Sequence, residues 1–174
     1  MVKLPPHVSP ETPGIDQFQQ LNHDYGAILI LWGTLEISIE ITIARLTGMS
    51  FLNASIVLGS LQFGAKRNIL SSLLRERGDT ERMKPLTNLI TFAKRNALVH
   101  SVMANESDHS RFDFHQREIK DAYKVTAHSF TADTFHDHFL KFIQLEALVN
   151  AALGISKNDL TQYAHEAKFS DIDH

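Results

Sequence analysis

The chain has 174 residues, of which 43% are hydrophobic and 21% are charged, and its formal net charge is −3 at pH 7. These values are typical of one compact globular domain, and the acidic balance excludes a protein coated throughout with cations for nucleic-acid binding. The sequence contains no cysteine, which excludes disulfides, thiolate metal sites and cysteine nucleophiles and favours a reducing compartment.

The N-terminal residues 1–15 predict an extended arm, because four of the five prolines lie there. This segment lacks the basic start and apolar core of a secretory signal. The most apolar stretch, residues 27–35, is too short to cross about 30 Å of hydrocarbon. We therefore expect a cytoplasmic protein with no membrane partner.

The first predicted helix covers residues 16–46 and ends before Gly48. Its apolar stripe recurs at three- and four-residue steps and consists of Trp32, Leu35, Ile39, Ile43 and Leu46. Residues 37–43 also alternate as a strand does, but the helical stripe extends beyond them on both sides, which favours a helix. Apolar residues on more than one face indicate burial on two sides, as in an oligomer.

The following segments predict a mainly helical order with one small excursion. The expected elements are a second helix over 50–78, a third that begins between 79 and 85 and ends near 103, short strands over 111–115 and 123–127, a fourth helix capped by Thr131 or Asp133 and stopped by Gly154, and a short helix over 156–168. This order predicts an all-α, up-and-down four-helix bundle over 16–154 with a small β-hairpin-like insertion between the third and fourth helices. Residues 155–174 form a C-terminal helix and tail.

Charge is concentrated in one segment, because residues 66–95 contain eight basic and three acidic side chains. Such a surface attracts a polyanion although the whole protein is acidic. Lys66, Arg67 and Lys94 are the predicted RNA contacts. Solvated helix faces explain the same charge run equally well.

The chemical signature of the chain is the run from Arg95 and Asn96 to His100. On a helix, Asn96 and His100 lie on one face, and the long Arg95 side chain reaches the same cleft. Histidine transfers protons at neutral pH, and an arginine fork stabilises charge on a phosphate. These groups suit RNA cleavage without a metal or cofactor, with Asn96 orienting the histidine or the phosphate.

The run from Arg95 to His100 resembles the signature of the HEPN superfamily, an arginine followed by a polar residue and, four to six residues after the arginine, by a histidine. The resemblance implies an all-α homodimer with a composite cleft and endoribonuclease activity that leaves 2′,3′-cyclic phosphate ends. Arg95, Asn96 and His100 are then the catalytic positions. It further implies a role as a toxin or defence protein with an antitoxin or regulatory partner, although Val102 stands where some toxin members have tyrosine.

Other interpretations of these residues remain open. His100 can cap helix carbonyls while Arg95 forms a structural ion pair, and a HEPN-like module can bind RNA, a nucleotide or a protein without cutting. His136 and His138 are two residues apart and point to different sides of a helix, so we expect no metal site there. Glu36 and Glu40 share a face, where we expect them to be solvated or paired with arginine across a dimer.

Overall fold

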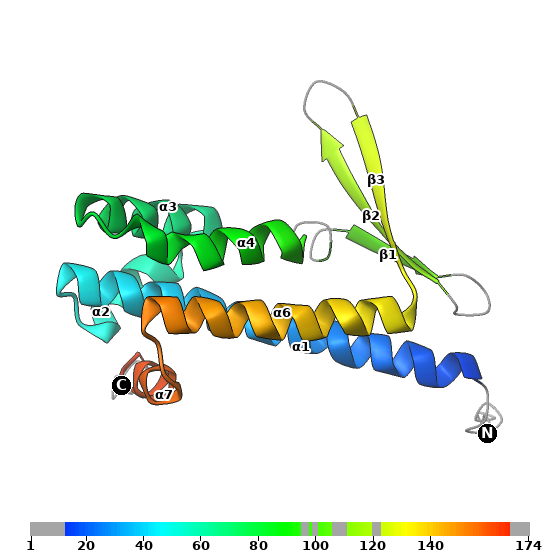
Figure 1. Ribbon diagram of the computed structural model, residues 1–174, viewed down its shortest axis with the longest axis horizontal. Coiled ribbons are helices and arrows are strands. Elements are labelled where there is room, and N and C mark those ends of the chain that lie inside the picture. Colours follow the sequence, from blue (N-terminus) through cyan, green and yellow to red (C-terminus); the bar gives the residue numbers. More distant parts are fainter. Residues whose placement is uncertain (1–12, 95–97, 99–100, 106–110, 120–122, 168–174) are drawn as a thin grey trace, which may run out of the picture. The chain divides into compact units, whose positions relative to one another are not determined.

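The computed structural model describes residues 13–94, 98, 101–105, 111–119 and 123–167. Its elements are α1 (Pro13–Thr47), α2 (Phe51–Gly59), α3 (Phe63–Glu76), the short 3-10 helix η1 (Thr80–Arg82), α4 (Met83–Ala93), β1 (Ser101–Asn105), β2 (Phe112–Ile119), β3 (Tyr123–Phe130), α6 (Ala132–Leu153) and α7 (Lys157–Glu166). Helices account for most of these residues, and the described strands form a small antiparallel sheet in the order β1–β2–β3 (Figure 1). The prediction of a predominantly helical fold with a small β insertion is confirmed.

The chain divides into two compact units. We call Met1–Gly26 with Lys94–Phe139 the sheet unit, and Ala27–Ala93 with Leu140–His174 the helical unit. Helices α1 and α6 contribute residues to both units. The periodicity of the sequence indicated one continuous bundle and did not indicate this division.

Residues 37–43, whose alternation also fits a strand, are helical within α1. Two of their polar side chains are satisfied inside the helix, because Ser38 donates to the Thr34 carbonyl and Thr42 donates to the Ser38 carbonyl. Residues 38–44 are all buried within this single chain. Their burial on more than one face therefore needs no second copy, and the oligomer inferred from this pattern loses its support.

The predicted helix over 50–78 is wrong, because the structure contains α2 and α3 with a break between them. The Ser50 side chain caps α2 by accepting the Asn53 amide at 3.2 Å. Gly59 ends α2 and Gly64 lies in the first turn of α3. A Cβ added at either glycine meets nothing within 4 Å, so these glycines do not serve close helix packing.

The predicted third helix also ends earlier than its pattern indicates. Helix α4 stops at Ala93, and Lys94 has a left-handed φ of 47°. Residues 101–103, expected at the end of this helix, lie in strand β1 (Ser101–Asn105). They pair with β2, with Met103 opposite Phe114. Pairing with a distant strand is decided by tertiary contacts, which outweigh local helical periodicity.

In the sheet unit, one face of the β2–β3 hairpin supplies the core. Phe112 and Phe114 are buried, and Phe112 pairs with Phe130 across the strands. The Phe114 ring lies 5.9 Å from Tyr25 of α1 and 5.8 Å from Phe135 of α6, measured between centroids. This hairpin confirms the predicted strand pair, and β1 adds to it on the other edge of β2.

In the helical unit, α1 and α6 run parallel. Trp32 of α1 contacts Phe142 of α6, and further along Arg45 donates to the carbonyl of Gly154, just after α6. In an up-and-down four-helix bundle the first and last helices are antiparallel. The parallel direction of α1 and α6 therefore differs from the predicted bundle. The predicted second helix is two helices, α2 and α3, so the chain has one more helix between α1 and α6 than predicted.

The predictions for the C-terminal helices are confirmed. Thr131 caps α6 by accepting the Thr134 amide, and Gly154 ends the helix with φ of 68°. Ser156 and Asp159 then form a capping box at the start of α7. Local sequence signals placed these boundaries correctly because both caps are made by nearby residues.

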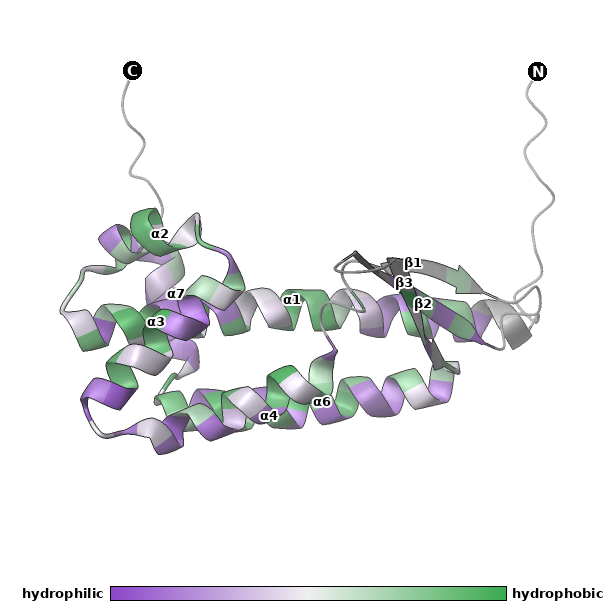
Figure 2. Ribbon diagram, turned by 90° about the horizontal axis from the view of Figure 1, so that it is seen from above, coloured by the Kyte–Doolittle hydropathy of each residue, from purple (hydrophilic) through white to green (hydrophobic). Residues whose placement is uncertain are grey.

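Helix α1 is long and apolar enough to cross a membrane by length and composition, with a mean hydropathy of 1.8 over its most apolar 18 residues. Of that window, 56% is buried inside the protein. A buried core helix passes the same test, and the hydropathy colouring in Figure 2 shows apolar residues recurring along α1. The sequence analysis considered only residues 27–35 and so underestimated the length of the apolar segment. The absence of a membrane partner stays a prediction.

Candidate functional site

The three predicted catalytic residues, Arg95, Asn96 and His100, lie outside the described residues. Because α4 ends at Ala93 and β1 begins at Ser101, the prediction that the third helix continues to about residue 103 is wrong. The structure does describe Lys94, Leu98 and Ser101, and the contacts of these three residues show what surrounds the motif.

Leu98, at the centre of the motif, is anchored in the sheet unit. Its side chain is only 2% exposed, and its carbonyl accepts a hydrogen bond of 3.1 Å from the Tyr25 hydroxyl of α1. Its amide donates to the Lys94 carbonyl, also at 3.1 Å. Since the Tyr25 ring packs on Phe114, the motif is tied at Leu98 to α1, next to the inner face of the sheet.

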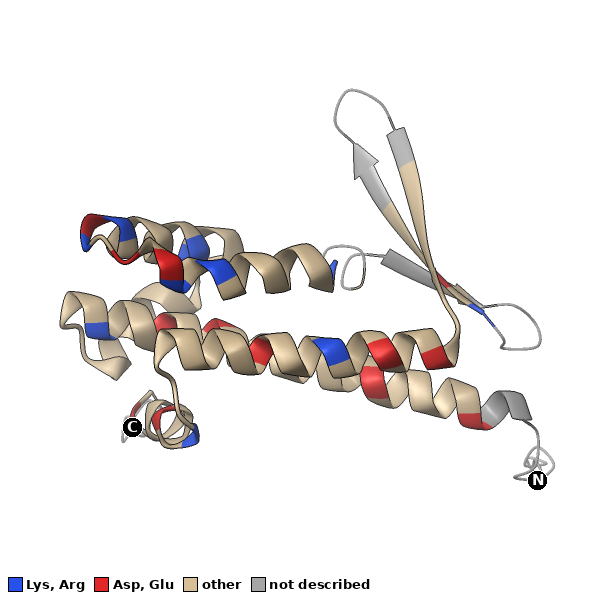
Figure 3. Cartoon of the chain, viewed as in Figure 1, with Lys and Arg blue, Asp and Glu red and all other residues tan. Residues whose placement is uncertain are grey.

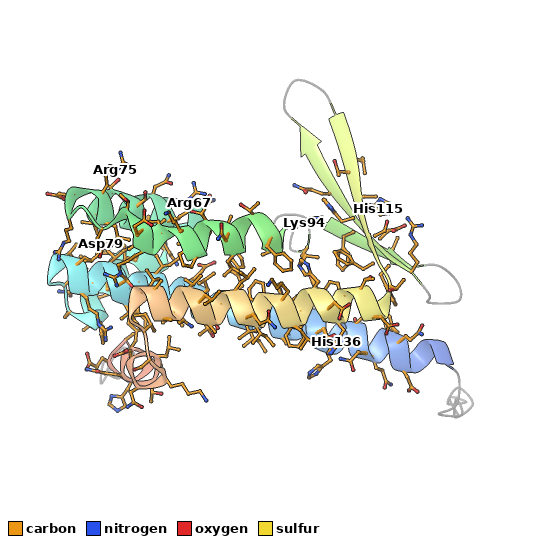
Figure 4. All side chains as sticks on the ribbon, viewed as in Figure 1. Arg67, Arg75, Asp79, Lys94, His115 and His136 are labelled. Carbon is orange, nitrogen blue, oxygen red and sulfur yellow. The ribbon has the colours of Figure 1, made fainter. Side chains whose placement is uncertain are left out.

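The face of the sheet that carries Phe114 also carries a histidine that interacts electrostatically with Lys94. His128 of β3 is half-buried and pairs with Phe114 of β2. Burial lowers the pKa of His128 from its ordinary value, and the ammonium of Lys94 lowers it further. Figure 4 labels Lys94, which is exposed at the end of α4. Nothing in the sequence pattern connected His128 to Lys94, because the two residues are distant along the chain.

The prediction that Lys66 contacts RNA is contradicted by its burial. Its side chain is 5% exposed, and its ammonium lies 2.6 Å from Glu40 and 3.1 Å from Glu36. Burial by itself lowers the pKa of Lys66, but the hydrogen bonds to Glu40 and Glu36 raise it above the ordinary lysine value. The two glutamates, expected to be solvated or paired across a dimer, neutralise a lysine of their own chain.

Two aromatic side chains complete this buried network in the helical unit. The Trp32 indole donates to Glu36 at 3.1 Å, and the Tyr163 hydroxyl of α7 donates to Glu40. Burial and then the Glu40 hydrogen bond raise the pKa of Tyr163, so its hydroxyl stays protonated. The network joins α1, α3 and α7, and we assign it a structural role.

Two other cations of residues 66–95, Arg77 and Arg82, also hold helices together. Arg77 donates to the Leu46 carbonyl, and Arg82 donates to the Ala152 and Leu153 carbonyls at 2.8 and 2.7 Å. Acidic residues lie among these cations at the turn between α3 and α4 (Figure 3). Three of the eight basic residues of this segment, Lys66, Arg77 and Arg82, therefore have structural roles.

The two remaining predicted RNA contacts, Arg67 and Lys94, are exposed. Arg67 belongs to the helical unit and Lys94 to the sheet unit, and their labelled side chains come from α3 and from the end of α4 (Figure 4). Their exposure leaves both available to a phosphate.

The histidines near the start of α6 have partners other than a metal. His136 Nδ1 lies 2.9 Å from the buried Asp24 carboxylate, which also accepts a hydrogen bond from Gln20. The His138 ring packs against Phe130. Among the residues that the structure describes, no three metal-binding side chains of His, Cys, Asp or Glu gather in one place.

Glu146 of α6 is a buried carboxylate without a cation in its hydrogen bonds. It is 9% exposed and accepts a hydrogen bond from Asn150. Burial raises the pKa of Glu146, and the Asn150 hydrogen bond offsets part of that rise. Its folded-state pKa therefore lies above its unfolded-state pKa, and the free energy of unfolding falls as the pH rises through the folded-state pKa.

We expect Glu146→Gln to be more stable than the parent above pH 7, with a difference that shrinks as the pH falls toward 4. Each unit of pKa elevation corresponds to about 1.4 kcal/mol of unfolding free energy. Urea denaturation between pH 4 and pH 8 measures the effect, and the exposed Glu166→Gln is the control. If the difference in unfolding free energy between Glu146→Gln and the parent is the same at every pH, this explanation is contradicted.

Comparisons with known proteins find no match: no protein-family model, no curated protein and no solved structure is similar to this chain. A functional assignment therefore depends on the motif from Arg95 to His100 and on the described residues around it.

Proposed function

We propose that this protein is a metal-independent endoribonuclease of the HEPN type. The observation that carries the proposal is the run Arg95-Asn96-Ala97-Leu98-Val99-His100, which has the residue types and spacing of that superfamily's signature. The buried Leu98 and its hydrogen bond from Tyr25 support it, because an anchored backbone restricts where the motif's side chains can reach.

In this proposal, Arg95 binds the scissile phosphate and stabilises the charge that develops on it. His100 transfers a proton, and Asn96 orients the histidine or the phosphate. The 2′-hydroxyl attacks the neighbouring phosphorus and leaves a 2′,3′-cyclic phosphate. Lys94 and Arg67 supply exposed cations for the RNA backbone.

We further propose a cytoplasmic homodimer with a composite cleft, and a toxin or defence role with a regulatory partner. The finer fold assignment belongs to the same proposal: a HEPN-like bundle built from α1, α3, α4 and α6, with α1 and α6 parallel. The contacts of α1 with Phe63 of α3 and Phe142 of α6 support this grouping.

A non-catalytic module that binds RNA, a nucleotide or a protein is the second candidate. The end of α4 at Ala93 and the left-handed φ of Lys94 favour it, because the motif is not the continuation of that helix on which the nuclease prediction was based. Such a module would bind its ligand through the same cations as the nuclease, but it would not cleave RNA.

Incubation of the purified protein with 5′-labelled mixed RNA in EDTA tests the proposal. Cleavage with cyclic phosphate ends, identified by acid hydrolysis to 2′- and 3′-monophosphates, is expected from the nuclease. Tight RNA binding in a mobility-shift assay without cleavage supports the second candidate. Absence of both cleavage and binding contradicts both.

A further inference from the structure

Helix α6 has an apolar side that the described residues of the helical unit leave uncovered. Between residues 140 and 153 its exposed positions recur every three or four residues, which places them on one side of the helix. Apart from Lys141 at the edge, these positions are Leu140, Ile143, Gln144, Ala147, Leu148 and Ala151. We call these six residues the outer face of α6. In the helical unit, Figure 1 shows α6 in front of α1 with no described helix in front of it.

The polarity of this part of α6 is the reverse of the usual one. A helix at the surface of a soluble protein normally turns its charged side chains to water and its apolar side chains to the core. Between residues 142 and 153 the single charged side chain is Glu146, and it is buried. Apolar side chains take the exposed positions instead, with Leu140 43% exposed and Leu148 57% exposed. A contiguous apolar surface of this kind is typical of an interaction site.

The chemistry of the outer face restricts what can cover it. The face contains no cation that could bind the phosphates of a nucleic acid. Helices that lie on a lipid surface have several lysines or arginines beside their apolar side, whereas Lys141 is the single residue of these two types in α6. An uncharged face can meet an identical face without repulsion between like charges. These properties favour a second copy of this chain.

The order of large and small residues along the outer face also fits a second copy. When a twofold axis runs perpendicular to two packed α6 helices, the helices are antiparallel and each residue faces one fixed position of the other copy. With the axis between Leu145 and Glu146, Leu140 faces the partner's Ala151 and Gln144 faces the partner's Ala147. A larger side chain is then opposite a small one at each of these positions, which lets the two helices approach closely.

We propose that two copies of this chain form a homodimer through the outer faces of their α6 helices. This inference rests on the homodimer of the proposed function, to which it assigns an interface, and it requires no RNA cleavage. From Leu140 to Ala151 the face is about 17 Å long on a helix about 10 Å wide. The pairing covers a few hundred Å² per copy, less than the roughly 800 Å² per partner of a standard interface, so we expect a reversible dimer with a micromolar dissociation constant.

The first test measures the oligomeric state of the full chain by sedimentation velocity over a series of protein concentrations. We expect a monomer at the lowest concentrations and a dimer at the highest. Leu148→Lys should raise the dissociation constant at least about tenfold, because the pair would then bury a cation without a partner. The thermal midpoint of the variant, measured in parallel, checks that it is folded.

Val57→Lys is the matched control for Leu148→Lys. Val57 belongs to α2 and is 53% exposed, close to the 57% of Leu148, but it lies outside the outer face of α6. The same change of an exposed aliphatic side chain to lysine is therefore made on another surface. We expect Val57→Lys to alter the dissociation constant by less than about twofold.

A pair of complementary charges tests the antiparallel register. Leu140→Lys and Ala151→Glu should each weaken dimer formation at least about tenfold when the variants are alone. An equal mixture of the two variants should recover a heterodimer, because position 140 of one copy faces position 151 of the other and the two introduced charges are opposite in sign. A mixture of Leu140→Lys with the parent should not show this recovery.

The outcomes separate this inference from the nuclease. A parent protein that stays monomeric at every concentration overturns the dimer and this interface, and RNA cleavage by that monomer would leave the nuclease chemistry standing. A dimer that Leu148→Lys leaves intact, or that Val57→Lys weakens equally, overturns the interface on α6 alone. Failure of the mixed charge variants to form a heterodimer overturns the antiparallel pairing.

Discussion

Replacement of Lys66 by methionine is expected to lower the free energy of unfolding by about 3–5 kcal/mol. The methionine keeps most of the apolar volume but leaves Glu36 and Glu40 without the cation that both contact. Glu40 is only 6% exposed, so its carboxylate gains little from water.

The exposed pair of Lys84 and Glu81 provides the matched control. Their side chains are 70% and 74% exposed, so Lys84→Met should change the unfolding free energy by less than about 1 kcal/mol. Urea denaturation of both variants at pH 7 gives the comparison. Adding Glu40→Gln to Lys66→Met should restore part of the stability. Equal losses in the two lysine variants would show that the buried network is not what stabilises this unit.

Removal of the motif histidine is expected to reduce RNA cleavage by about 10²–10⁴-fold, the usual contribution of a general acid or base. The His100→Ala variant tests this in EDTA, and Arg95→Ala should cause a loss of similar order because it removes the phosphate clamp. Initial rates on a labelled RNA, with the thermal midpoint measured in parallel, separate lost chemistry from lost folding.

His165 and Arg75 are exposed on α7 and α3 and serve as controls for the two substitutions. Alanine at either position should leave the cleavage rate within about twofold, because exposed side chains outside the site contribute little. A His100→Ala protein that still cuts RNA at the parent rate contradicts the nuclease proposal. Parent protein that binds RNA without cutting it supports the non-catalytic module instead.

Part of the candidate site was predictable and part was not. The sequence identified Arg95, Asn96 and His100 from residue type and spacing, and these remain predictions because they lie outside the described residues. It did not identify the electrostatic interaction of His128 with Lys94, because the two residues are distant in the chain. It assigned Lys66 to RNA because charge is visible in a sequence, whereas a buried partner 26 residues away is not.

The amino-acid sequence by itself determined the helical character of α1 and α6 and the ends at Gly154 and Ser156, because periodicity and capping act between residues a few positions apart. Tertiary structure alone decided the break between α2 and α3, the early end of α4, the strand β1 and the buried ion network. The pairing of β1 with β2 and the ion network depend on contacts between segments distant in the chain. Burial and strand pairing there outweigh local preferences of about 1 kcal/mol per residue or less.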